Sequence, residues 1–466
     1  MKKSLLISVA LILALHPAGA DSLLDGYIRR GLTGNLALQQ ESLSLEKSIE
    51  ALKEARAMFL PTLSLQARYS RAGGGRIIEF PVGDLVNPVY KSLNDLFRFH
   101  GIAAGFPTDL PNEIIPFLRE REQETKVRLV QPLLRPALVH NLKIRSHLSR
   151  AEDAKLEAFK HRLIADIRIA YFNVGKARRI VALLEETREL LEENLRISQN
   201  LYDAGMATED IVFRARAELA GLERETAAAE KNNRLAASYF NFLLNRDLDA
   251  EIDFEETPLP PGVGAAGPES VSSEDPARRV EFRQLGHVLD ARKQEIKLAS
   301  SGYLPSLTAV VDYGIQGPDY RFGRDDDYWM ASLIFEWTLF DGGRNRSQKA
   351  RAALEKRTLD VQRAELENRI RLQSSDAALA LEASLKAVEA ARAAEAAAAR
   401  ALAIVRDKFE SGAALPIEFI EARTAWTAAA AEAVAAEFDT LQMQAEYEWA
   451  AGRIDPARYE SKEKDR

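Results

Sequence analysis

The chain has 466 residues, of which 46% are hydrophobic and 29% are charged, and its formal net charge is -7. It contains no cysteine, which excludes disulfides, thiolate metal sites, cysteine nucleophiles and a lipid-modified N-terminal cysteine. An acidic chain is also a poor candidate for binding nucleic acid, because phosphates select basic surfaces.

The first twenty residues are predicted to form a signal peptide. Two lysines precede an apolar run at 5–15, and the small residues Ala18 and Ala20 give the pattern of a cleavage site after Ala20. The apolar run is too short to cross a bilayer as a helix. Cleavage would lower Lys+Arg from 63 to 61 against 70 Asp+Glu, for a net charge of -9, and we therefore expect an exported acidic protein.

An internal repeat organises the rest of the chain. The segment 59–63, Phe-Leu-Pro-Thr-Leu, resembles the segment 303–307, Tyr-Leu-Pro-Ser-Leu, and 202–205 resembles 409–412 in the same order. Each copy is predicted to run helix, strand, loop, strand, long helix, tight tip, long helix. Self-similarity of this kind indicates one structural plan used twice.

The repeat sets the predicted domain boundaries. The signal peptide at 1–20 is followed by a first copy at 21–254 and, after a linker at 255–276, by a second copy at 277–452. The linker is rich in proline, glycine and serine, which favours an irregular segment. A C-terminal tail occupies 453–466.

Four strands are predicted near 62–70, 125–134, 306–315 and 328–338. Apolar and polar residues alternate in each of them, which gives a strand one apolar and one wet face. A soluble, half-buried sheet would show the same alternation. Each run has about ten residues, the length of a tilted membrane strand. Aromatic residues that favour a bilayer interface lie near the ends: Tyr69, Tyr313, Tyr328, Trp329 and Trp337.

If the four strands cross a membrane, they must belong to a closed β-barrel. No later stretch of the sequence is long and apolar enough for a transmembrane helix, so the chain would enter a bilayer only as part of a closed barrel. Four strands cannot close a barrel, because small barrels need about eight. A barrel must therefore be shared between chains.

The loop at 71–124 joins the first two strands and is much longer than its counterpart in the second copy. It contains three consecutive glycines, several prolines and recurring phenylalanines. The glycines lack the strand-to-helix context of a phosphate-binding loop. We expect a partly ordered external lid or partner site.

Two helical hairpins are predicted at 138–248 and 344–450, with tips near 205 and 412. The segment 138–202 has no proline and one glycine, Gly175, and 344–409 has neither. A heptad stripe runs through Ile180, Leu183, Thr187, Leu190, Asn194, Ile197 and Leu201. Leu184, Leu191 and Leu195 widen it, so this helix should contact more than one neighbour.

Both hairpins are predicted to end in a compact turn. The first turn comprises Gly205, Met206, Ala207 and Thr208, and the second comprises Gly412, Ala413, Ala414, Leu415 and Pro416. Glycine suits the left-handed residue that follows a helix, and proline suits the first turn of the next one. Acidic residues after Thr208 favour a helix N-terminus there.

Taken in order, these motifs resemble the TolC family of outer-membrane efflux proteins from Asn35 to about Gly452. The motifs are the two Leu-Pro strand starts, the strand ends at 131–134 and 337–343, and the two glycine tips. The resemblance implies an α+β membrane protein of long coiled-coil helices with four transmembrane strands per chain. A homotrimer would pool its strands into one 12-stranded β-barrel and its helices into a periplasmic tunnel.

The resemblance also implies a location, partners and a function. The chain would be the passive exit duct of a tripartite efflux or type I secretion system in the outer membrane of a Gram-negative bacterium. Its hairpin tips would contact a periplasmic adaptor, which links the duct to an inner-membrane transporter. Outer-membrane lipid would surround the barrel, and no nucleic acid, cofactor or metal is expected.

A gate is predicted by register with the family. In that family, acidic residues six and nine positions after the glycine of the second tip narrow the tunnel entrance. The same positions in this chain are Glu418 and Glu421. Three chains would place six carboxylates around one opening, which attracts cations. The first copy has Arg214 at the second of these positions, and we hypothesise that it pairs with an acid of a neighbouring hairpin. A solvated helix face is the alternative for the two glutamates.

Other functions are less well supported by the residues. The six histidines show no metal-ligand spacing, and no nucleophile elbow is present, so we predict no enzyme and no catalytic residues. The acidic run 325–327 suits a solvated loop or a weak cation site. A periplasmic coiled-coil adaptor or scaffold would retain the hairpins without needing the duplicated strands. A self-contained porin is opposed by the strand number.

Overall fold

The computed structural model describes residues 22–459, apart from 104, 256, 258, 260–274, 321–322, 324–325 and 412. The predicted signal peptide with Ala18 and Ala20, the tip residue Gly412, most of the predicted linker and the end of the predicted tail lie outside these residues. The chain divides into a helical unit, which comprises Met1–Ala51, Ile144–Lys293 and Ala353–Arg466, and a sheet unit, which comprises Leu52–Lys143 and Gln294–Ala352. Each unit takes residues from both copies of the sequence repeat.

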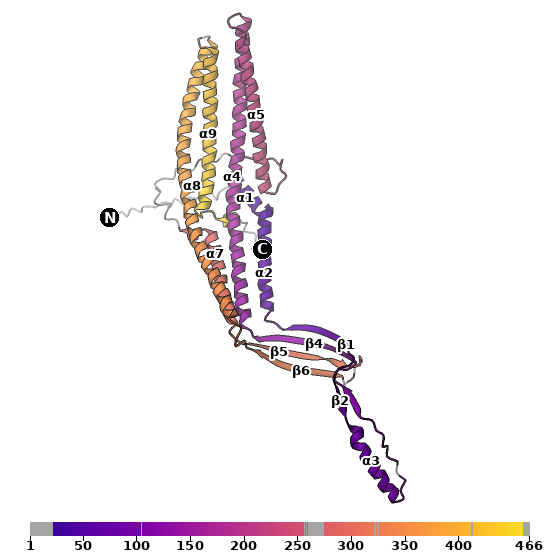
Figure 1. Cartoon of the computed structure of the whole chain (residues 1–466). Coiled ribbons are helices and arrows are strands. Elements are labelled where there is room, and N and C mark those ends of the chain that lie inside the picture. Colours follow the sequence, from indigo (N-terminus) through magenta and orange to yellow (C-terminus); the bar gives the residue numbers. More distant parts are fainter. Residues whose placement is uncertain are drawn as a thin grey trace, which may run out of the picture. The chain divides into compact units, whose positions relative to one another are not determined.

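In the described part of the chain, seven α-helices contribute to the helical unit, and several continue into residues of the sheet unit (Figure 1). They are α1 (Leu23–Gly34), α2 (Leu36–Ala57), α4 (Pro136–Asp203), α5 (Asp210–Leu243), α7 (Val280–Ser301), α8 (Arg344–Glu410) and α9 (Pro416–Ala450). Short 3₁₀ turns occur at Pro276–Arg278 and Pro456–Arg458. Among the described residues, none of the helices combines the length and apolarity needed to cross a membrane.

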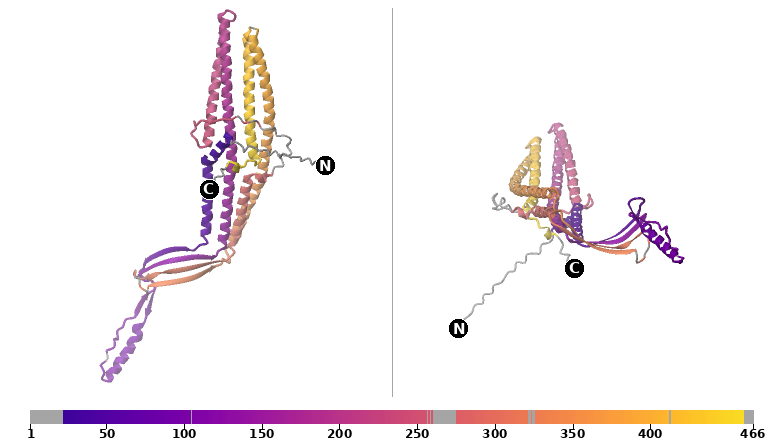
Figure 2. Two further views of the ribbon diagram at one scale, coloured as in Figure 1. Left: turned by 180° about the vertical axis from the view of Figure 1, so that it is seen from behind. Right: turned by 60° about the horizontal axis from the view of Figure 1, so that its bottom comes forward.

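Two helices are far longer than is usual in globular proteins. α4 has 68 residues and α8 has 67, which corresponds to roughly 100 Å each at 1.5 Å per residue. Each pairs with a shorter helix, α5 or α9, to form a hairpin, and Figure 2 shows the two hairpins side by side. Helices of this length need lateral partners along their whole course.

The helix α4 packs on two neighbours through two adjacent stripes. Leu184 and Leu191 contact Leu222 of its own partner α5. Leu190 and Ile197 instead pack against the cluster at the end of the second hairpin. The predicted contact of this helix with more than one neighbour is therefore confirmed.

The largest core of the helical unit is built around aromatic rings. Tyr171 and Phe172 of α4 and Phe240 of α5 are almost completely buried, and the ring centroid of Phe240 lies 5.1 Å from that of Tyr27. The hydroxyl of Tyr171 accepts a 2.8 Å hydrogen bond from the backbone N–H of Glu255. The start of the predicted linker is thus fixed to this core.

The sheet unit holds one four-stranded antiparallel sheet in the order β1-β4-β5-β6. Its strands are β1 (Thr62–Arg71), β4 (Arg121–Leu134), β5 (Ser306–Gly317) and β6 (Asp327–Glu336). The central pair, β4 and β5, joins the two copies of the repeat, which explains why neither copy is a compact unit by itself. Within the described chain, β1 and β6 form the two edges of this sheet.

The alternation of side chains is interrupted at the end of β4. The register with β5 shifts between Pro132 and Leu134, which is a β-bulge at Leu133. Proline has no N–H to donate to a ladder and is tolerated at such irregularities. Leu133 is therefore the residue left without a partner in the β4–β5 ladder. β6 also ends at Glu336, so Trp337 follows the strand, and its indole N–H donates to the carbonyl of Tyr303 at 3.1 Å.

The long first loop is more ordered than expected. It contains a two-stranded sheet of β2 (Ile77–Phe80) and β3 (Glu113–Pro116), with the helix α3 (Val82–Phe99) between them. Asn87 and Asn94 each use both amide atoms to bond the backbone of the returning chain, at Leu110 and Phe106 respectively. These side-chain amide bonds, rather than backbone pairing between strands, hold α3 to the returning segment.

Candidate functional site

The first hairpin tip is a glycine-ended turn. α4 stops at Asp203, and Gly205 has φ +69°, the left-handed conformation that glycine adopts without strain. The backbone N–H of Met206 bonds the carbonyl of Leu201 at 2.9 Å, which closes the turn. The Met206 side chain is 77% exposed at the tip. After Ala207, the hydroxyl of Thr208 donates to the carboxylate of Asp210 in the first turn of α5.

The second hairpin tip is closed by stacked rings. The centroids of Phe409, at the end of α8, and Phe419, in the first turns of α9, are 5.2 Å apart with an interplanar angle of 18°. Ala413 and Ala414 both donate backbone N–H bonds to the carbonyl of Lys408, at 2.7 and 3.2 Å. Leu415 is exposed, and Pro416 is the first residue of α9, as predicted.

The two predicted gate glutamates lie on the first turns of α9, and both are exposed. Glu418 also accepts a 3.2 Å hydrogen bond at Oε2 from the backbone N–H of Leu415. This bond satisfies one of the free N–H groups at the start of the helix. Glu418 therefore has a capping role that the sequence analysis did not foresee.

Within one chain, Arg214 pairs with its own helix rather than with a neighbouring hairpin. Its Nη2 lies 3.4 Å from Oδ2 of Asp210, four residues earlier in α5, and both side chains are largely exposed. Residues at this spacing share a helix face, so the contact is local. Pairing with an acid of another hairpin stays a prediction.

The side chains that do join the hairpins were missed. Nη2 of Arg423 on α9 lies 2.5 Å from Oε2 of Glu218 on α5. Arg423 is only 6% exposed, so this is a nearly buried ion pair between the two hairpins. Thr187 and Thr427 add a hydroxyl contact of 3.3 Å between α4 and α9. No local pattern could have revealed the ion pair, because its members are 205 residues apart.

A small cavity lies between the hairpins just behind their tips. It has a volume of about 150 Å³, and Arg214 of α5 and Pro416 of α9 contribute to its wall. Asn194 and Ser198 of α4 also line it, and their buried polar side-chain atoms have no hydrogen-bond partner in the described part of the chain. Buried polar groups normally find a partner, so the amide of Asn194 and the hydroxyl of Ser198 are exceptions to that rule.

The second functional feature is the apolar face of the four-stranded sheet. One row runs across all four strands through Leu65, Val127, Tyr313 and Trp329, which are paired in register. Leu65 is 73% exposed and Trp329 is 75% exposed. A contiguous exposed apolar surface of this kind marks contact with a membrane or another protein.

The opposite face of the same sheet is charged. The guanidinium of Arg128 on β4 binds the carboxylate of Asp312 on β5 through two hydrogen bonds of 2.8 and 2.7 Å. Lys126 and Tyr328 both bond Oε1 of Glu124 at 2.8 Å. The alternation predicted from the sequence thus separates an apolar face from a face of paired charges.

A comparison with known protein families agrees with the two helical hairpins and with a sheet that has one apolar and one charged face. Residues 271–453 match the family model described as outer membrane efflux protein. The resemblance to TolC proteins is confirmed by relatives. Outer membrane protein OprJ of Pseudomonas aeruginosa is 25% identical over 289 residues, which cover 60% of this chain and 58% of OprJ.

Two further matches extend over more of the chain. Outer membrane protein TolC of Salmonella enteritidis is 22% identical over 371 residues, or 76% of this chain and 66% of that protein. The chain thus spans 58% to 66% of the length of these curated relatives. The solved structure of the Campylobacter jejuni CmeC outer membrane channel has the same fold, with a TM-score of 0.73 at 17% identity over 94% of this chain and 88% of CmeC.

Proposed function

We propose that this chain is an outer-membrane channel, the passive exit duct of a tripartite efflux or type I secretion system in a Gram-negative bacterium. The observation that carries the proposal is the exposed apolar face of the sheet, backed by a face of paired charges, in a chain that also holds two long hairpins. An adaptor or scaffold would need the hairpins and not this sheet. The names of OprJ, TolC and CmeC, each an outer membrane protein or channel, support the same location.

The two edges of the sheet support a shared barrel. β1 and β6 run antiparallel to one another, because three antiparallel pairings separate them. The β6 edge of one copy can therefore continue the alternation by pairing with the β1 edge of the next. Unpaired edges invite such pairing. Three copies would close a 12-stranded barrel with its apolar face toward lipid and its charged face toward the lumen.

Engineered disulfides test this closure, because the chain has no native cysteine. Ser332→Cys on β6 is combined in turn with cysteine at 62, 64, 66, 68 or 70 on β1. Within one chain these edges are about 14 Å apart across the sheet, too far for a disulfide, which requires Cα atoms within about 7 Å. We expect at least one register to give covalent dimers and trimers, and nothing larger, in protein extracted from outer membranes with mild detergent.

The control is Ser332→Cys alone, which should remain monomeric on a denaturing gel. A ladder beyond the trimer would contradict a closed three-chain ring, and monomers at every register would contradict pairing of these edges. Recovery of the protein in the soluble periplasmic fraction would favour the adaptor alternative.

The proposed duct opens and closes at the hairpin tips, which would also contact a periplasmic adaptor linked to an inner-membrane transporter. Met206 and Leu415 offer exposed apolar side chains for that contact. Glu418 and Glu421 would form a ring of six carboxylates in the trimer. Such a ring raises the local concentration of cations at a narrow opening.

Charge removal at the tip tests the gate. Glu418→Gln with Glu421→Gln should lower the cation-to-anion permeability ratio by about twofold or more, because the field that concentrates cations is lost. The glutamine oxygen can still accept the N–H of Leu415, so the helix cap is retained. The measurement is the reversal potential in planar bilayers under a KCl gradient. Glu432→Gln, an exposed position further along α9, is the matched control, and an equal change in both proteins would refute the gate assignment.

A further inference from the structure

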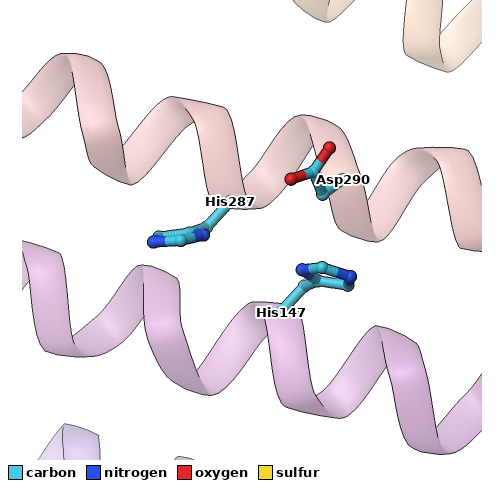
Figure 3. Close-up of side chains that lie close together, drawn as sticks. All are labelled: His147, His287 and Asp290. Carbon is cyan, nitrogen blue, oxygen red and sulfur yellow. The ribbon is translucent and has the colours of Figure 1, made fainter. Parts of the chain in front are cut away.

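A cluster of three metal-ligating side chains lies between α4 and α7 of the helical unit. Figure 3 shows the imidazole of His147 projecting from α4 toward α7, the imidazole of His287 in the space between the two helices, and the carboxylate of Asp290 beside α7. One ligand atom from each of the three lies within 4.8 Å of the others. The cluster uses none of the side chains assigned to the hairpin tips or the sheet.

The fold brings these residues together in a simple way. His287 and Asp290 are three residues apart on α7 and so share one face of the helix. α4 and α7 run antiparallel, since Arg283 forms an ion pair with Glu157 while the earlier His147 meets the later Asp290. The third ligand therefore comes from a helix that is distant in sequence, which is why the spacing of the histidines did not predict a site.

One possible ligand atom of the cluster lacks a hydrogen-bond partner in the described part of the chain. Nδ1 of His147 is buried and has no hydrogen-bond partner in the described part of the chain. A buried polar atom left unbonded is costly, and each such atom in a native structure calls for an occupant or a function. Asp290 uses Oδ1 to bind Nζ of Lys293 at 2.8 Å, which leaves its other oxygen for a ligand.

The donor set selects a class of metal. Two imidazole nitrogens and one carboxylate oxygen suit zinc and similar divalent ions, which bind three protein ligands and leave a fourth position to water. Ligand bonds of about 2.0–2.2 Å in a tetrahedron place donor atoms about 3.3 Å apart. Separations of up to 4.8 Å must therefore shorten by at most about 1.5 Å, a movement that rotation of the three side chains can supply.

We propose that His147, His287 and Asp290 bind one divalent metal ion of the zinc type per chain, and that the ion clamps α4 to α7. The site is separate from the proposed duct function, and its test measures metal binding rather than transport. A metal that binds only the folded state stabilises it by mass action, and the stabilisation grows with the logarithm of the ratio of free metal to the dissociation constant.

The test uses the full chain purified in detergent without a polyhistidine tag and stripped with a chelator. Co²⁺ is titrated while the visible absorption bands of the bound ion are recorded, and Zn²⁺ is then added as a competitor. We expect one ion per chain. His147→Ala and His287→Ala should each weaken binding by at least about tenfold, and Zn²⁺ should raise the thermal unfolding midpoint of the native chain only.

Two further variants separate a lost site from a misfolded one. His161→Ala removes another α4 histidine, whose buried Nε2 makes no hydrogen bond among the described residues and lies 3.9 Å from Oε1 of Glu157, and it should bind Co²⁺ as the native chain does. Lys293→Gln frees the second oxygen of Asp290 and removes a nearby positive charge, so it should bind more tightly, a gain that misfolding cannot produce. Absence of binding by the native chain, or unchanged binding by His147→Ala, would overturn the proposal.

Discussion

Replacing Glu218 with alanine should destabilise the helical unit by about 3–5 kcal/mol, because it leaves the nearly buried guanidinium of Arg423 without its ion-pair partner. The partner guanidinium, on Arg423, is nearly buried, and its Nε has no hydrogen-bond partner among the residues that the structure describes. The substitution removes the carboxylate 2.5 Å away, which is the counterion of that guanidinium among the described residues. The measurement is the free energy of unfolding, from urea denaturation of the detergent-solubilised protein followed by helical circular dichroism.

Replacing the arginine of the same ion pair should lower the free energy of unfolding much less. Arg423→Met keeps most of the packing volume and removes the buried charge, and the freed Glu218, whose side chain is 40% exposed, can be hydrated. Buried ion pairs commonly show this asymmetry. Glu223→Ala, at an exposed site on the same helix, should change stability by no more than about 0.5 kcal/mol.

Equal losses for Glu218→Ala and Arg423→Met would contradict the assignment of a buried cation. The two substitutions also bear on the proposed duct, since both remove the ion pair between the hairpins. We expect both to raise single-channel conductance relative to Glu223→Ala, because the tips are then held together less strongly.

Replacing Gly175 with alanine should destabilise the protein by about 1–3 kcal/mol, although alanine is the better helix former. A Cβ at this position of α4 would lie 2.3 Å from Cζ of Phe254 and 2.6 Å from Cε1 of Phe438. Contacts this short require both rings to move within the main core. The expected result is a lower unfolding midpoint in the same urea measurement.

Gly221→Ala is the matched control for that substitution. Gly221 also lies inside a long helix, α5, and a Cβ added there would meet nothing within 4 Å. Only the gain in helix propensity remains, so this variant should be more stable by about 0.5–1 kcal/mol. If both substitutions moved the unfolding midpoint in the same direction, crowding by the two rings would not explain the effect at Gly175.

Several features of the protein were determined by local sequence alone. Alternation along the strands predicted a sheet with one apolar face, and the row from Leu65 to Trp329 is that face. The long segments without proline predicted the two hairpins. Gly205 predicted the left-handed residue that closes the first tip. These features depend on periodicity and backbone preference, which a few neighbouring residues carry.

Other features were decided only by the tertiary structure. The bulge at Leu133 depends on the register with β5, and the order of α3 depends on amide bonds to a returning segment. The Arg423–Glu218 pair and the cluster at His147 join residues that are far apart in the chain. Such contacts follow from how the helices and strands pack, and a charged or imidazole side chain carries no local signal of the partner that packing will bring to it.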